Sequence, residues 1–311
     1  MLAESNLFEK IPCALCGGQD FKVLKPSAYP KELDRQHLLS LYKSSSEAKL
    51  LDQLVKCEHC QMVQISPRVH QEIILSSYSG AIDPKFIEQD TWRIKTFSRS
   101  LKKICKTLNI SPSKNIKVLD IGCAGGAFPK EASDAGFSVI GVEPSRWLCV
   151  EGKKRYHLDL RPGILEEQEF EPLSFDIITL WDVIEHLTDP EKTMAKIKTL
   201  LKPNGALVVN YPDYGSWQAK IFGKRWPFLL SVHLYYFTPQ TISNFFKKCS
   251  FEIIETRPHR QSLGLGYVLE RASGYFSIFK LFYKISKILK IENLPFVYNI
   301  GQTQVIARVK K

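Results

Sequence analysis

The chain has 311 residues, of which 44% are hydrophobic and 24% are charged, and its formal net charge is +11 at pH 7. This length allows one large domain and a small additional module. No run of 18 uncharged apolar residues occurs, which argues against a transmembrane helix. Residues 1–12 lack the apolar core of a signal peptide, so we expect a cytoplasmic protein.

Two Cys-x-x-Cys pairs lie near the N-terminus: Cys13 with Cys16, and Cys57 with Cys60. Such pairs bring four thiolates to one tetrahedral zinc ion, and a closed four-cysteine site is structural rather than catalytic. The alternative is two disulfides, which a cytosolic chain does not retain. The spacing therefore predicts a structural Zn²⁺ in a zinc-ribbon module over residues 1–70.

The segment between the two cysteine pairs is long for a zinc ribbon. Residues 38–54 are predicted to contain a helix, with the serines 44–46 as a turn or cap, and we interpret His59 as a bystander. Residues 71–110 are predicted to form a helical linker or cover. The large domain is expected over residues 111–311.

Residues 118–126 read Val-Leu-Asp-Ile-Gly-Cys-Ala-Gly-Gly, an apolar strand followed by a glycine-rich turn. Glycines are needed where the backbone passes close to a ligand, and open α/β sheets bind ligands at the carboxyl ends of their strands. A dinucleotide-binding fingerprint would map onto Gly122, Ala124 and Ala127, so two of its three glycines are missing. The ligand is therefore not expected to be a dinucleotide.

The elements that follow alternate between strand and helix. Residues 138–142 predict a strand with Glu143 at its end, where an acid can accept hydrogen bonds from ribose hydroxyls. Residues 175–181 predict another buried strand. Residues 190–202 have helical spacing and end in Lys-Pro-Asn-Gly, before a strand over residues 206–210. This alternation predicts a doubly wound parallel sheet.

The glycine-rich turn resembles motif I of class I S-adenosylmethionine-dependent methyltransferases, usually Asp-x-Gly-x-Gly-x-Gly. Asp120, Gly122 and Gly126 match it, while Ala124 stands at the middle glycine. Further motifs of that superfamily follow in order across residues 110–260. The resemblance implies an α/β Rossmann-like sheet of order 3-2-1-4-5-7-6 with the last strand antiparallel, and S-adenosylmethionine as the methyl donor.

The resemblance and the loop positions together define the expected donor site. Asp120, Gly122 and Gly126 should line the methionine end of the donor, Glu143 should bind the ribose, and the adenine should lie near Ile164 and Leu165. The complete set of expected donor-binding residues is Asp120, Gly122, Cys123, Ala124, Gly126, Glu143, Ile164, Leu165 and Trp181.

An alcohol acceptor benefits from a base that removes its proton, and the candidates are His233, His186 and Asp182. The segment from Asp182 to His186 resembles an acid-x-x-Glu-His cluster of ubiquinone-pathway O-methyltransferases, which is associated with a divalent cation. A cation at Asp182, Glu185 and His186 is one reading. The others are a general base, or side chains that orient the loop.

A four-cysteine ribbon before such a domain resembles a bacterial methyltransferase group whose members carry segments like Gly-Lys-Arg-Trp (residues 223–226) and His-Leu-Tyr-Tyr-Phe-Thr-Pro (residues 233–239). The group implies a surface-glycan, lipid-linked or small-molecule acceptor. The aromatic loop of residues 212–232 is a candidate lid. The Asp/Asn-Pro-Pro-Tyr sequence of many amino-group methyltransferases is absent here, which favours an oxygen or carbon acceptor.

Two last strands are predicted at residues 251–257 and 304–310, with an insertion over about 262–300. Within it, residues 276–290 predict an amphipathic helix with lysines on one face. The lysines are Lys280, Lys284, Lys287 and Lys290. The apolar face consists of Ile278, Leu281, Phe282, Ile285, Ile288 and Leu289. Such a helix either lies in an anionic membrane interface or packs its apolar face on the domain.

Two other functions remain open at this level. The positive charge also suits an rRNA or tRNA methyltransferase whose zinc ribbon grips RNA, although residues 16–57 show only scattered basic side chains. An inactive methyltransferase-like binding module is the second alternative, because Ala124 replaces a glycine of the donor loop.

Overall fold

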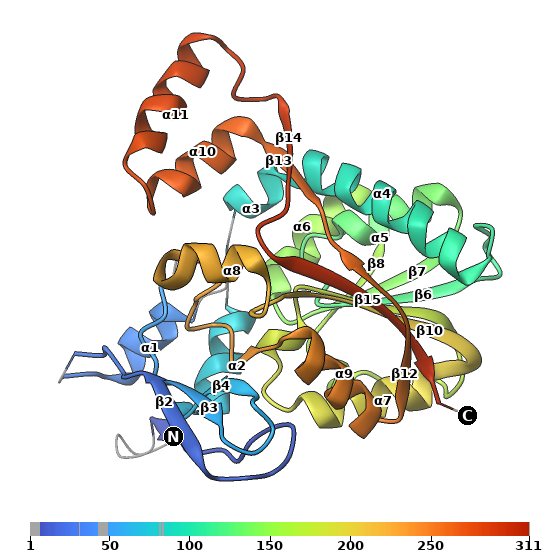
Figure 1. Ribbon diagram of the computed structural model, residues 1–311. Coiled ribbons are helices and arrows are strands. Elements are labelled where there is room, and N and C mark those ends of the chain that lie inside the picture. Colours follow the sequence, from blue (N-terminus) through green and yellow to red (C-terminus); the bar gives the residue numbers. More distant parts are fainter. Residues whose placement is uncertain (1–6, 31, 43–48, 81, 83, 311) are drawn as a thin grey trace.

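The computed structural model describes residues 7–30, 32–42, 49–80, 82 and 84–310. A seven-stranded sheet lies at its centre, in the order β12-β15-β10-β9-β6-β7-β8 (Figure 1). Its strands are β6 (Lys117–Ile121), β7 (Ser138–Glu143), β8 (Asp159–Pro162), β9 (Phe175–Trp181), β10 (Leu201–Pro212), β12 (Phe251–Pro258) and β15 (Gln302–Val309). Only β15 runs antiparallel to its neighbours. This is the order 3-2-1-4-5-7-6, so the predicted fold class is confirmed.

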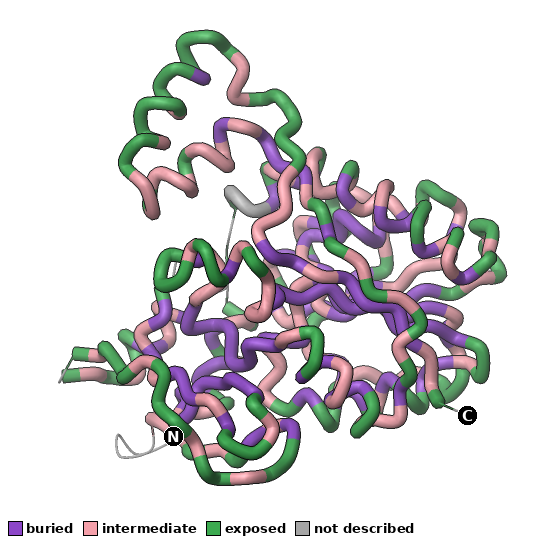
Figure 2. The backbone as a smooth tube through the Cα atoms, in the orientation of Figure 1, coloured by how far each residue is buried: buried purple, intermediate pink, exposed green. Residues whose placement is uncertain are grey.

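Helices cover both faces of the sheet, because successive strand residues point to opposite faces. Val118 and Ile177 pack with the helices on one face, and Leu119 and Ile178 belong to the cluster on the other. The first face carries α4 (Asp90–Leu108), α5 (Ala127–Ala135) and α6 (Arg146–Tyr156), and the second carries α7 (Pro190–Leu200) and α9 (Pro239–Lys248) (Figure 1). The buried backbone in Figure 2 follows the sheet between these layers.

A second sheet joins the N-terminal segment to a short strand from the second half of the chain. Its order is β11-β4-β3-β2, in which β11 (Tyr235–Tyr236) follows the end of the main sheet's β10 in the chain. The other three strands are β2 (Phe21–Lys25), β3 (Leu54–Cys57) and β4 (Val63–Ile65). In addition, β1 (Phe8–Glu9) pairs with β5 (Arg68–Val69). The N-terminal cysteine segment is therefore hydrogen-bonded to the loop that contains His233.

The helix expected over residues 38–54 is shorter and earlier than predicted. It is α1 (Arg35–Leu41), which begins after Asp34, whose carboxylate accepts a hydrogen bond from the backbone N–H of His37. The serines 44–46 lie outside the described residues. Residues 49–53 carry no helix before β3 begins.

Three helices follow the cysteine segment: α2 (Gln71–Ser79), α3 (Pro84–Glu88) and the longer α4. Leu101, Ile104 and Leu108 of α4 recur at helical spacing and are buried in the core cluster of the sheet's first face. The helix ends at Asn109, whose left-handed backbone caps it. This segment therefore covers the sheet rather than standing apart from it.

The helix predicted over residues 190–202 ends earlier, because Leu201 already pairs with Phe175 of β9. Residues 202–205 lie inside β10, where the pairing register shifts between Leu201 and Ala206. Pro203 disfavours a helical conformation at the preceding residue, which accounts for the early end.

The insertion before the last strand forms a hairpin of two helices. It begins with β13 (Gln261–Gly264), continues through α10 (Leu265–Ser273) and α11 (Ile278–Ile288), and returns through β14 (Pro295–Tyr298), which pairs with β13. Figure 1 shows the two helices projecting from the body of the molecule. None of the described helices combines the length and the apolar composition needed to cross a bilayer.

Candidate functional site

In the glycine-rich loop after β6, the backbone conformation and neighbouring atoms leave little room for side chains. Gly122 has a φ of 68°, and a Cβ there would lie 2.5 Å from Cγ2 of Val183. Gly126, with a φ of 87°, immediately precedes α5. Ala124 also has a positive φ, 47°, which a glycine would adopt with less strain. The loop geometry thus explains why a glycine is usual at this position.

Glu143 lies at the carboxyl end of β7 and contacts this loop. The backbone N–H of Ala124 donates to its Oε2, and the N–H of Ser145 donates to its Oε1, both at 2.9 Å. Burial raises the pKa of Glu143 to about 7, against the effect of these two hydrogen bonds. Each carboxylate oxygen accepts about two hydrogen bonds, so one lone pair on each remains for a ligand.

Asp120 and Cys123 are buried on either side of Gly122. The Thr179 hydroxyl donates to Oδ1 of Asp120 at 2.6 Å, which holds the carboxyl group inside the sheet. Burial keeps the pKa of Asp120 well above its ordinary value, and it does the same for the thiol pKa of Cys123. A protonated Cys123 is a poor nucleophile.

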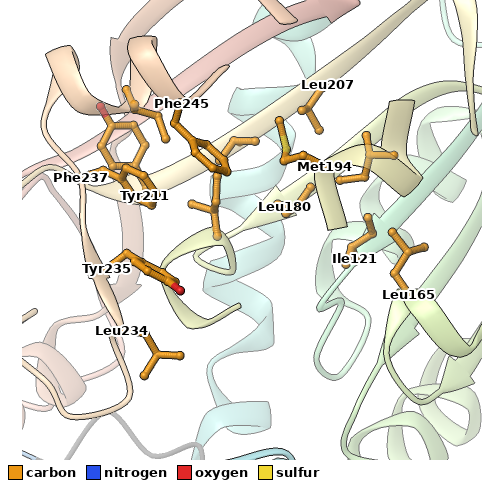
Figure 3. Close-up of a cluster of buried hydrophobic side chains, with 14 of the residues drawn as sticks. Ile121, Leu165, Leu180, Met194, Leu207, Tyr211, Leu234, Tyr235, Phe237 and Phe245 are labelled. Carbon is orange, nitrogen blue, oxygen red and sulfur yellow. The ribbon is translucent and has the colours of Figure 1, made fainter. Parts of the chain in front are cut away.

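The three remaining expected donor residues differ in accessibility. Ile164 is partly exposed, whereas Leu165 is buried in the same cluster as Ile121 (Figure 3). Trp181 ends β9, and its ring lies 5.2 Å from that of Phe128 and 5.5 Å from that of His259. Among the described residues, its indole N–H has no hydrogen-bond partner.

Asp182 follows β9 in a left-handed conformation, with a φ of 55°. Side-chain amides surround its carboxylate: Asn210 and Gln302 donate to Oδ1 at 2.5 and 2.7 Å, and Gln261 donates to Oδ2 at 3.2 Å. Burial raises the pKa of Asp182 to about 6, against the effect of these donors. The positive φ and the amide donors fix the carboxylate at the carboxyl end of β9.

A separate cluster groups Glu185, His186 and His233. One possible ligand atom from each lies within 4.8 Å of the others, and the two imidazole rings are 4.7 Å apart at an angle of 83°. The cation site expected from the sequence combined Asp182 with Glu185 and His186. The structure instead brings His233 to that pair, from a segment 47 residues further along the chain.

The two histidines have the same hydrogen-bond arrangement. Nδ1 of His186 lies 2.8 Å from the carbonyl oxygen of Val232, and Nδ1 of His233 lies 2.8 Å from that of Phe228. A carbonyl oxygen can only accept, so each Nδ1 carries the proton and each Nε2 keeps its lone pair. The Tyr78 hydroxyl is also 2.8 Å from Nδ1 of His186.

The protonation states of this cluster follow from its burial. Burial lowers the pKa of His186 to about 4, and burial together with nearby His186 keeps the pKa of His233 well below its ordinary value. Both rings are therefore neutral at pH 7. Burial, and then the charge of Asp182, keep the pKa of Glu185 well above its ordinary value, and neither of its oxygens has a partner among the described residues.

The aromatic loop predicted as a lid is mostly packed inside the protein. Trp226 is 1% exposed, and its indole N–H donates to the carbonyl oxygen of Ile300 at 2.7 Å. Phe222 and Phe228 are partly buried, whereas Trp217 is 66% exposed. The segment before His233 is thus fixed by contacts with the N-terminal sheet and the last strand.

The four N-terminal cysteines converge as their spacing predicts. Their sulfur atoms all lie within 4.8 Å of one another, with 3.4 Å between Cys13 and Cys60 and 3.5 Å between Cys16 and Cys57. Sulfur atoms around one zinc ion are about 3.8 Å apart, so the cluster fits a single tetrahedral metal ion. His59 instead pairs with Asp20, at 2.9 Å.

A cationic hollow of about 150 Å³ lies at the carboxyl end of β12, between that strand and α4. Its lining includes Arg99, Lys103, Arg257, Arg260 and the buried His259. Burial, and then the charges of Arg99, Arg257 and Lys103, lower the pKa of His259 to about 3. No sequence pattern predicts this hollow, because its residues come from separate segments.

The chain is similar in sequence to ubiquinone biosynthesis O-methyltransferases. It is 28% identical to that of Bartonella quintana over 173 residues, which cover 50% of this chain and 69% of the relative. It is 32% identical to that of Rhodopseudomonas palustris over 105 residues, which cover 32% of this chain and 42% of the relative. The chain thus spans less than half of the latter protein's length.

Solved structures with a similar fold include a possible histamine N-methyltransferase from Thermotoga maritima. The TM-score is 0.48 at 19% identity, and the alignment covers 73% of this chain and 94% of that one. YcgJ from Bacillus subtilis has a TM-score of 0.47 at 16% identity, covering 68% and 98% of the two chains. The profile of the family described as "Methyltransferase domain" matches residues 92–256, which include β6 to β10 and their loops. On this match, the chain belongs to the methyltransferase domain family.

Proposed function

We propose that the protein transfers a methyl group from S-adenosylmethionine to an oxygen or carbon atom of a small-molecule, glycan or lipid-linked acceptor. The observation that carries the proposal is the contact between Glu143, at the end of β7, and the glycine-rich loop after β6. This contact places the Glu143 carboxylate beside a backbone that a ligand can approach closely. Each of its oxygens accepts one hydrogen bond from the described residues and can accept another from a ligand. Because the chain belongs to the methyltransferase domain family, we interpret Glu143 and the glycine-rich loop as a binding site for the methyl donor.

The donor would lie along the carboxyl edge of β6, β7 and β9. Glu143 would accept hydrogen bonds from the ribose hydroxyls. Asp120, Gly122, Cys123, Ala124 and Gly126 would surround the methionine end. Ile164 would contact the adenine through its partly exposed side chain, and Leu165 would contribute backbone because its side chain is buried. Trp181 would offer its indole N–H, which has no partner among the described residues.

His233 and His186 are the proposed bases for an alcohol acceptor. Both rings are neutral, and each Nε2 carries a lone pair, as general-base catalysis requires. The acceptor oxygen would attack the methyl carbon as the C–S bond breaks. Its proton would pass to Nε2, and S-adenosylhomocysteine would leave. Asp182 is fixed by three amides, so its role would be to position the loop after β9.

The same cluster fits a divalent cation. Glu185 has two buried oxygens without partners among the described residues, and one possible ligand atom from each of the two imidazole rings lies within 4.8 Å of a Glu185 oxygen. Glu185, His186 and His233 would hold the ion, and a bound cation would lower the pKa of an acceptor hydroxyl. Electron paramagnetic resonance of Mn²⁺ added to the zinc-loaded protein would test this. Binding lost in Glu185→Gln would support the cation, whereas no binding in wild type would leave the histidines as bases alone.

The four cysteines would bind a structural zinc ion. Their sulfur separations fit tetrahedral coordination, and four protein ligands leave no open position for catalysis. The zinc would then hold together the turns that precede β2 and follow β3.

An acceptor that carries phosphate is favoured by the cationic hollow beside β12. Cationic side chains around a small concave site bind anions such as phosphate. Arg99→Ala combined with Lys103→Ala should raise KM for such an acceptor and leave its kcat little changed. Equal effects on a neutral acceptor would contradict this reading of the hollow.

The test of the function is incorporation of labelled methyl groups from S-adenosylmethionine into fractionated lysate of cells that lack the protein. Label in the lipid, glycan or small-molecule fraction would support the proposal. Label in RNA would favour the RNA methyltransferase. If no fraction is labelled and the donor also fails to bind, the chain would be an inactive binding module.

A further inference from the structure

Helix α11 presents an apolar stripe to solvent. We define this stripe as the six apolar residues of the predicted face, which are Ile278, Leu281, Phe282, Ile285, Ile288 and Leu289. All six are exposed, by 39% to 78% of their surface. Of the two alternatives left open by the sequence, packing of this face on the domain is therefore not what the structure shows.

The contacts of α11 with the rest of the protein come from a different face. Ser286 is buried, and Phe279 and Tyr283 are partly buried on the same side of the helix. Helix α11 packs mainly on its hairpin partner α10. The apolar stripe stays exposed beside this contact, and Figure 2 colours most of α11 as exposed.

Exposed apolar side chains continue beyond α11. Leu294, Phe296 and Val297, on the returning segment, are each 41% to 53% exposed. Helix α8 (Trp217–Phe222) adds Ile221 and Trp217, and the rings of Phe222 and Phe276 connect it to the start of the hairpin at 6.2 Å. The six residues of the stripe share one face of α11, and an exposed apolar face of this kind marks an interaction site on a folded protein.

The charges beside the stripe indicate what covers it. Lys280, Lys284, Lys287 and Lys290 are all exposed, and residues 272–291 contain no acidic side chain. At 100° per residue, Lys284 and then Lys280 border the stripe on the side away from α10, whereas Lys287 lies over the ring of Tyr283. Apolar residues bordered by lysines, with a long apolar stem on each lysine, suit the interface of an anionic bilayer.

We propose that α11 lies in the plane of an anionic lipid bilayer, with its apolar stripe among the acyl chains and its lysines at the lipid phosphates. The helix has eleven residues, so it would rest on one leaflet and not cross it. This surface is independent of which acceptor is methylated.

The experiment is co-sedimentation of the full chain with vesicles of phosphatidylglycerol and phosphatidylcholine in equal parts, against vesicles of phosphatidylcholine alone. We expect binding only to the anionic vesicles. Lys280→Gln with Lys284→Gln should weaken it about thirtyfold, because each charge near the surface contributes about fivefold. Leu281→Ser with Ile288→Ser should weaken it by more than about tenfold.

The matched control is Val150→Ser, which alters an equally exposed apolar residue on α6. Circular dichroism and donor affinity verify that every variant is folded. Absence of binding to anionic vesicles would overturn the proposal, as would binding that the stripe variant leaves unchanged. A dimer in gel filtration that Leu281→Ser with Ile288→Ser dissociates, without vesicle binding, would assign the stripe to a second copy of this chain and also overturn it.

Discussion

Replacement of Glu143 by alanine is the most direct test of the donor site. Each carboxylate oxygen accepts one backbone N–H at 2.9 Å and keeps one lone pair, which leaves two positions for the two ribose hydroxyls. A hydrogen bond to a charged group contributes about 1.5–3 kcal/mol. Loss of that amount corresponds to a dissociation constant roughly 10- to 150-fold higher.

Isothermal titration calorimetry with S-adenosylhomocysteine measures this loss without turnover. The control is Glu252→Ala, which removes an exposed carboxylate from β12. If Glu143→Ala binds within about twofold of the wild-type protein, the carboxylate does not bind the ribose, since even one such bond exceeds that difference.

The same carboxylate predicts a pH dependence with a definite sign. The pKa of Glu143 is raised to about 7 in the ligand-free protein, and the ribose hydroxyls require its ionised form as acceptor. Below pH 7 donor binding must first remove a proton, so affinity falls as pH falls, by about tenfold between pH 8 and pH 6. Affinity that is flat in pH, or that rises on acidification, would contradict this assignment.

The remaining predictions concern the zinc site, the aromatic loop and the proposed base. Cys60→Ser should lower bound zinc from one equivalent toward none, as measured by atomic absorption. Trp226→Ala should destabilise the protein by about 3–5 kcal/mol in urea unfolding, because the side chain is fully buried, whereas exposed Trp217→Ala should change stability by less than about 0.5 kcal/mol. His233→Gln should lower kcat by about 10²–10⁴-fold and leave donor affinity unchanged; an equal loss of donor affinity would point to a structural role.

The parts of the site that are local in sequence were predictable. Gly122 and Gly126 lie in the loop after β6, and Glu143 ends β7, all within 22 residues, so the rule that ligands bind at the carboxyl ends of parallel strands brings them together. The four-cysteine site could also be predicted, because the geometry of metal coordination constrains the spacing of its ligands in the sequence.

The parts that depend on distant segments were not predictable. Nothing near Asp182 indicates that Gln261 and Gln302 enclose it, and nothing near His186 indicates that His233 and Tyr78 lie beside it. Periodicity identified the apolar face of residues 276–290, but it could not tell which face a neighbouring element covers. Which face is covered depends on the short α10–α11 connection, which turns the face with Ser286 toward α10 and leaves the apolar stripe exposed.

The short strand β11 has a consequence for how the protein unfolds. Residues 235 and 236 pair with β4, the backbone N–H of Ile65 donates to Leu234, and that of Leu234 donates to Glu185. The cysteine segment cannot detach without breaking bonds that reach the carboxyl edge of the main sheet. We therefore expect the described part of the cysteine segment to unfold together with the main sheet, so that calorimetry records a single melting transition rather than two.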